Sequence, residues 1–118
     1  MITRGFYTAL GRLLANADPT AVITSVGFGS ANTAESFDDT TLSDDAYIRP
    51  IRDIEIDTDN PRLVRIHWTL GPNEAAGLMI RELGLLTDDS VLVARIARAT
   101  AIEKTTDMEL GDWFELQL

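Results

Sequence analysis

The sequence predicts an α+β domain in which one N-terminal helix packs on a mainly antiparallel β-sheet or sandwich of about six strands. Apolar residues recur at helical spacing near the N-terminus, and they alternate with polar residues over much of the rest. Hydrophobic residues make up 45% of the 118 residues and charged residues 25%, which is typical of a globular chain. No internal repeat or change of composition divides the sequence, so residues 1–118 are expected to form a single domain.

The helix is expected over residues 3–16. Thr3 is the predicted N-cap, and Asp18-Pro19 is the predicted stop, because proline cannot continue the hydrogen-bond ladder. A group of apolar side chains falls at spacings of three and four residues and should share one face of this helix. The group consists of Phe6, Ala9, Leu10, Leu13 and Leu14.

A strand rich in β-branched residues is expected over residues 21–28. At its end, Gly27-Phe28-Gly29 is similar to the start of a dinucleotide-binding fingerprint. Asn32 occupies the third glycine position, however, and no helical pattern follows, so a tight turn is expected instead. Residues 29–45 are small, polar and acidic without periodicity, and they predict a long, mobile surface loop that could act as a contact arm.

The next strand is expected over residues 47–57, where isoleucines alternate with acidic residues, and another over residues 63–70. Between them, Asp57-Thr58-Asp59-Asn60-Pro61 has the composition of a turn, so the two strands should form an antiparallel hairpin. One face of the second strand is apolar and is expected in the core. Its residues are Val64, Ile66, Trp68 and Leu70.

Residues 78–86 and 91–99 flank a short polar connection and predict a second hairpin. Both runs are almost continuously apolar, which is typical of central strands covered on two faces. Residues 113–118 alternate again between apolar and polar side chains. They predict a last strand.

Arg81 and Glu82 interrupt one of these apolar strands and should point to opposite faces of the sheet. They are either edge or surface residues, or charge-assisted contacts that fix the strand register or a subunit interface. Gly84 lacks a side chain where the strand needs packing, which indicates a bulge or the close approach of another backbone. Arg81, Glu82 and Gly84 are therefore the candidate interface residues.

The composition weighs against several other kinds of site. The formal net charge of −9 repels phosphate backbones and anionic lipids, so neither nucleic acid nor a membrane is expected as a partner. No cysteine is present to form disulfides or thiolate metal sites. His67 is expected on a sheet surface, and the acidic group within residues 38–45 is expected to be solvated. No catalytic residue, cofactor or metal is predicted.

Several short motifs occur in an order that is similar to a known family. The most specific is Ile80-Arg81-Glu82-Leu83-Gly84-Leu85, followed by an acidic turn and by Leu92-Val93-Ala94. Other matching elements lie at residues 6–13, 26–29, 40–42, 49–51 and 59–61. In these elements the sequence resembles the N-terminal domain of phage tail-collar and tail-fibre proteins, which occurs in contractile-tailed phages, prophages and tailocin particles.

The resemblance implies a structural component of the virion tail that attaches a tail fibre to the baseplate or collar, and that is made in the bacterial cytoplasm. It carries no catalytic residues, its partners would be phage baseplate or tail proteins, and such fibres are usually homotrimers. The alternative function is a small carbohydrate-binding β-sandwich, for which Tyr47, Trp68 and Trp113 could supply stacking surfaces. An enzyme that uses a pair of its acidic side chains is the third alternative.

Overall fold

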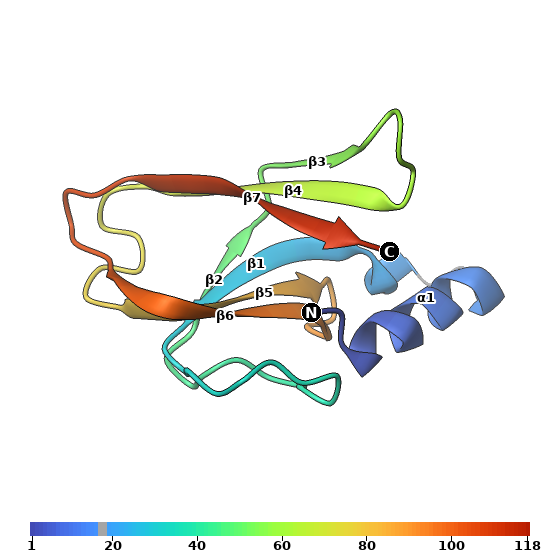
Figure 1. The fold of residues 1–118 in the computed structure, drawn as a ribbon, viewed down its shortest axis with the longest axis horizontal. Helices are drawn as coiled ribbons and strands as arrows, with labels where there is room; N and C mark the ends of the chain where they lie inside the picture. The colour runs from blue at the N-terminus through green and yellow to red at the C-terminus, as the bar shows by residue number, and fades with distance from the viewer. Residues whose placement is uncertain (17–18) are drawn as a thin grey trace.

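The computed structural model describes residues 1–16 and 19–118, and it confirms the predicted α+β class (Figure 1). One helix packs at the end of two antiparallel sheets, which face each other across an apolar core. The helices are α1 (Arg4–Asn16) and the short 3₁₀ helix η1 (Pro19–Ala21). The strands are β1 (Ile23–Gly29), β2 (Tyr47–Pro50), β3 (Asp53–Ile56), β4 (Leu63–Leu70), β5 (Met79–Thr87), β6 (Leu92–Glu103) and β7 (Leu110–Gln117).

The helix begins where the sequence predicts, and Thr3 directly precedes its first residue, but the Thr3 side chain does not cap the helix. The Thr3 side chain is fully buried, and its Oγ1 donates a hydrogen bond to the Leu92 carbonyl (2.7 Å). Residues 1–3 run beside β6, so the hydroxyl is committed to that strand rather than to the first turn of the helix. Asp18 of the predicted stop lies outside the described residues.

Only part of the predicted helix face is covered. Ala9 is buried, and Phe6 and Leu13 pack against the core from its margin. Leu10 is 38% exposed and Leu14 is 79% exposed, so these two side chains do not share the core-facing position. The apolar stripe of α1 is therefore wider than the surface on which the helix packs.

The four-stranded sheet has the strand order β2-β1-β5-β6. It contains the predicted hairpin of β5 and β6, but only β5 is central, because β6 lies at the edge of the sheet. The edge position is partly covered by the N-terminal residues: Thr3 N donates to the Val93 carbonyl (3.0 Å), and Ile2 forms an isolated bridge with Ala94. This cover explains the nearly continuous apolar sequence at the start of β6.

The three-stranded sheet has the order β3-β4-β7, and its β3–β4 hairpin turns at residues 57–62 as predicted. The expectation of one strand over residues 47–57 is wrong, because the chain changes sheets between β2 and β3. Ile51 N donates to the Thr24 carbonyl in the four-stranded sheet (3.0 Å), and Arg52 N donates to the His67 carbonyl in the other (2.8 Å). Pro50, which has no N–H to donate, directly precedes this crossing.

Gly27 and Gly29 lie within β1, so the tight turn expected at Gly27-Phe28-Gly29 is also wrong. Between them, Phe28 points into the space between the sheets, and its ring meets that of Trp68 edge-on, with centroids 4.9 Å apart. Phe28 is fully buried and Trp68 is 8% exposed, which confirms the predicted core position of Trp68. The two rings join the sheets at the centre of the core.

Candidate functional site

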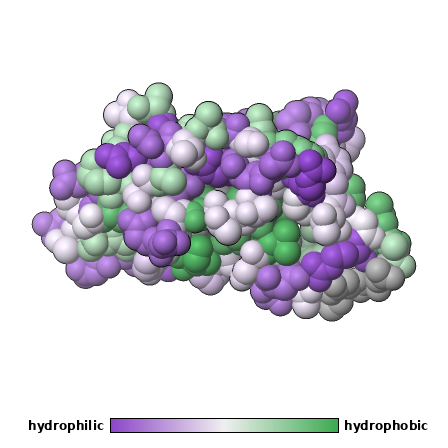
Figure 2. All heavy atoms as spheres, turned by 90° about the horizontal axis from the view of Figure 1, so that it is seen from below, coloured by the Kyte–Doolittle hydropathy of each residue, from purple (hydrophilic) through white to green (hydrophobic). Residues whose placement is uncertain are grey.

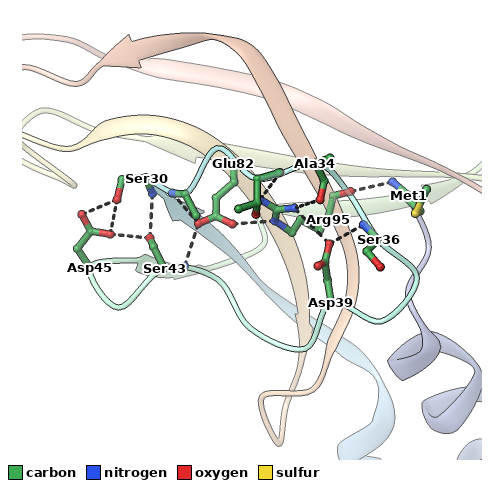
Figure 3. A network of polar contacts seen from close by, with 11 residues as sticks. Met1, Ser30, Ala34, Ser36, Asp39, Ser43, Asp45, Glu82 and Arg95 are labelled. Carbon is green, nitrogen blue, oxygen red and sulfur yellow. Dashed lines mark hydrogen bonds and ion pairs between the residues drawn. The ribbon is translucent and has the colours of Figure 1, made fainter.

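A buried ion pair on the four-stranded sheet holds the long loop of residues 30–46, which contains no helix or strand (Figure 3). Glu82 lies on β5 and Arg95 on β6, and Arg95 Nε donates to Glu82 Oε1 at 2.8 Å. Their side chains are 1% and 2% exposed. Charges so far from water are stable only when each polar atom has a partner, so the surrounding contacts decide what this pair does.

Arg95 uses its remaining donors on the loop. Its guanidinium donates to the Thr33 carbonyl (3.0 Å), to the Ala34 carbonyl (3.4 Å) and to Asp39 Oδ2 (3.2 Å). Burial disfavours the charged form of Arg95, but the carboxylates of Glu82 and Asp39 outweigh this effect, and the pKa of Arg95 is raised. Arg95 is thus a fixed cation that fastens the first half of the loop.

Glu82 fastens both ends of the same loop. Its Oε2 accepts hydrogen bonds from Ser43 N (2.8 Å) and Ala31 N (3.1 Å), while Oε1 binds Arg95. A Cβ at Gly29 would collide with Glu82 Oε2, so glycine is required where the carboxylate crosses β1. Because both carboxylate oxygens are occupied inside the chain, Glu82 acts as a structural anchor.

The acidic residues of the loop serve separate contacts rather than one site. Asp39 binds Arg95, Asp38 pairs with Arg4 at the start of α1 (2.6 Å), and Asp45 accepts hydrogen bonds from serines. The Ser43 and Ser30 hydroxyls lower the pKa of Asp45. Within residues 1–16 and 19–118, no group of three His, Cys, Asp or Glu residues is placed to hold a metal ion.

The three candidate interface residues therefore have different environments. Glu82 is buried and paired within the chain, while Arg81 is half-buried and its side chain forms no hydrogen bond or ion pair with the part of the chain that the structure describes. The β5–β6 register shifts between Ile80 and Glu82, whereas Gly84 is paired in regular register with Arg95, so the bulge expected at Gly84 does not lie at that residue. At Gly84 the close approach comes from side chains and not from a backbone: an added Cβ would lie 2.7 Å from Leu92 Cδ1 and 2.9 Å from Leu42 Cδ2.

Two buried cations were not predicted from the sequence, and only Arg95 carries the signal that singled out Arg81 and Glu82. Arg95 is a charge within an apolar strand, and Lys104 directly follows β6. Lys104 is fully buried, and its Nζ donates to the carbonyls of Gly71 (3.1 Å) and Thr105 (2.9 Å). A charge inside an apolar run thus pointed to Glu82 and Arg95, whereas Lys104 lies among Glu103 and Thr105 and had no such signal.

The loop-covered face of the molecule offers little apolar surface. Figure 2 shows that face from below, with hydrophobic residues in small patches between hydrophilic ones. Leu42 reaches from the loop onto the paired Gly27 and Gly84 of the sheet beneath it. This layer thus closes the outer side of the four-stranded sheet.

An uncovered apolar groove lies at the α1 end of the sandwich. It consists of two adjoining cavities of about 370 and 440 Å³, which share Phe6, Ile23 and Ile54 in their walls. Ile54 is 50% exposed and Ile56, beside it on β3, is 63% exposed, so the predicted apolar face of this strand is only partly covered. Surfaces of this kind in soluble proteins commonly mark sites of protein association.

The aromatic residues do not form a common binding face. Trp68 is in the core, Tyr47 donates a hydrogen bond to Glu74 Oε2 (3.3 Å), and Trp113 is 39% exposed on the outer face of the three-stranded sheet. Trp113 stacks on His67 with ring centroids 4.7 Å apart. His67 therefore lies on a sheet surface, as the sequence predicts, and it is held there by an aromatic neighbour.

No protein-family model, curated protein or solved structure matches this chain. The described residues include no helix that is long and apolar enough to cross a lipid bilayer.

Proposed function

We propose that this chain is a structural component of a phage-type virion tail, which attaches a tail fibre to the baseplate or collar. The observation that carries the proposal is the apolar groove beside α1, because an attachment domain must bury part of its surface against another protein. The similarity of the short motifs to tail-collar and tail-fibre proteins supplies the identity of the particle.

The arrangement of charges also favours a structural role. The contacts that hold the loop use the charged groups of Glu82, Arg95 and Asp39. Both carboxylate oxygens of Glu82 accept hydrogen bonds within the chain, so neither is available to a substrate. A general acid or nucleophile needs a group that can reach a reacting atom. The buried pair instead holds the loop of residues 30–46 against the four-stranded sheet, which is a structural role.

Labelled particles would test this function. Antibodies raised against the purified chain should bind tailed particles from the producing bacterium at the tail tip or collar in electron micrographs. Particles from cells in which the gene is deleted should retain tails but lack attached fibres. Particles that carry no label, or that keep their fibres after the deletion, would contradict the proposal.

The alternative of a carbohydrate-binding module has one supporting observation, the partly exposed Trp113 ring stacked on His67. A glycan array with the wild-type chain and with Trp113→Ala separates the two functions. Glycan binding that is lost in Trp113→Ala would favour the carbohydrate module. The attachment function predicts no such binding by either protein.

A further inference from the structure

Strand β3 presents an unpaired edge beside the apolar groove. Among residues 1–16 and 19–118, its only strand neighbour in the sheet is β4, and all four of its residues are exposed. Asp57 N donates to the Leu63 carbonyl, and in an antiparallel ladder such bonds alternate along the strand. The amide of Ile54 therefore points away from β4, and it is held instead by the side chain of its neighbour, Asp53 Oδ1 (2.9 Å).

The two faces of β3 have opposite chemistry. Ile54 and Ile56 are on the face toward the core, where Ile56 is paired across the sheet with Val64. Asp53 and Glu55 are on the outer face and are exposed to solvent. A strand added to this edge would place alternate side chains in the groove and the intervening ones opposite the two carboxylates.

From this geometry we infer that β3 binds an extended segment of a partner protein in which apolar and basic residues alternate. Main-chain hydrogen bonds to the free edge would hold the segment, as in other cases of strand addition. Its apolar side chains would cover Ile54, Ile56 and the cavity walls formed by Phe6 and Ile23. Its Lys or Arg residues would lie across from Asp53 and Glu55.

Charge selects this occupant over a second copy of the chain. Two β3 edges paired with each other would set Asp53 and Glu55 of one copy against the same carboxylates of the other, and like charges directly opposite are destabilising. The formal net charge of −9 also attracts a basic partner.

The inference rests on the proposed function only for the source of the segment, which would be a baseplate or tail protein. Peptides test the surface itself. The probe is a peptide of three Lys-Val repeats, compared with three Glu-Val repeats, three Lys-Ser repeats, and a Lys-Val peptide N-methylated on the amides that face β3. Amide shifts in NMR titrations at low salt should move at residues 53–57 with the Lys-Val peptide, and each of the other peptides should bind at least about fivefold more weakly.

Variants of the exposed residues locate the site without disturbing the core. Ile56→Ser should weaken binding of the Lys-Val peptide by about fivefold or more, whereas Leu14→Ser, an exposed leucine outside both cavities, should leave it unchanged. Glu55→Lys should reduce the preference for the Lys-Val peptide over the Glu-Val peptide, because only Asp53 of the two carboxylates remains. Arg65, which lies 3.6 Å from Glu55, keeps its closer contact with Asp57 (2.9 Å), so the fold should tolerate this change.

Several results would overturn the inference. These are equal binding of the Lys-Val and Glu-Val peptides, full binding of the N-methylated peptide, and an equal effect of Leu14→Ser and Ile56→Ser. Self-association that is lost in Ile56→Ser, without peptide binding, would assign the groove to a second copy. If particles carry the chain at the tail but no peptide binds, only the inference about β3 is contradicted. If the Lys-Val peptide binds but the chain is absent from particles, only the attachment function is contradicted.

Discussion

Replacing Arg95 by leucine should destabilise the domain by about 3–5 kcal/mol, because the substitution leaves the Glu82 carboxylate buried without its counter-charge. Leucine fills part of the space, so the main loss is electrostatic. The substitution also removes the hydrogen-bond donors to the Thr33 and Ala34 carbonyls and to Asp39. The hydrogen bonds cannot be summed separately, because they belong to one network. Even the lower figure is a large share of the roughly 5–15 kcal/mol that stabilises a typical domain.

Denaturant unfolding measures this loss as a shift of the midpoint, and hydrogen exchange shows where it acts. Amides of residues 31–43, including those of Ala31 and Ser43 that bind Glu82, should exchange faster in Arg95→Leu than in the wild type, and a protease should cut the loop first. Arg98→Ala is the matched control, since Arg98 is an exposed arginine of the same strand and should change the stability by less than about 0.5 kcal/mol. An Arg95→Leu protein within about 1 kcal/mol of the wild type would refute the assigned role of the pair.

Three further predictions concern the core, an ion pair and assembly. Trp68→Ala should cost about 3–5 kcal/mol in unfolding experiments, because the buried ring packs on Phe28; an unchanged midpoint would contradict this packing. The hydrogen bond from Arg65 lowers the pKa of Asp57, so the stabilising effect of this ion pair is present above about pH 4 and is lost as the pH falls through the lowered pKa of the folded state. Asp57→Asn should therefore cost less stability near pH 2 than near pH 7. An equal cost at the two pH values would refute the assignment. Sedimentation of the wild-type chain should give a trimer, and a monomeric wild type would contradict this. If the half-buried Arg81 is at the interface, Arg81→Ala should dissociate the trimer into folded monomers. An unfolded variant would instead place Arg81 inside the domain.

The local elements could be predicted because their signals are local. Helical spacing located α1, and period-two alternation with the Asp57-Thr58-Asp59-Asn60-Pro61 turn located the β3–β4 hairpin. The change of sheet at Ile51 was missed although the pattern breaks there. Apolar and acidic residues alternate only over residues 53–57, and Arg52 and Asp53 stand together between Ile51 and Ile54. Periodicity reports which way a side chain points relative to its own strand, and contains no information on which sheet supplies the partner.

The candidate site, too, could be predicted only in part from the sequence. The sequence showed that Glu82 needed a partner, but the partner is Arg95 on the next strand, and the bonds that complete the pair come from loop backbone at Ala31 and Ser43. A polar composition predicts a mobile loop only if nothing else in the chain binds its backbone. Here a pair of buried charges supplies those bonds, and their long sequence separation hides the relation.

The motifs that resemble tail-fibre proteins supply the α1 wall of the groove, at Phe6, Ala9 and Leu13, as well as the sheet residues beneath the loop. The motif residues of the four-stranded sheet support the loop. Gly27 and Gly84 make room for Leu42, and Gly29 makes room for the Glu82 carboxylate, which binds the loop backbone. A sequence that shares these motifs should therefore share the loop layer, whatever it binds. The exposed residues of β3 lie outside the motifs. The resemblance thus bears on the architecture, whereas the chemistry of the partner must be tested at β3 itself.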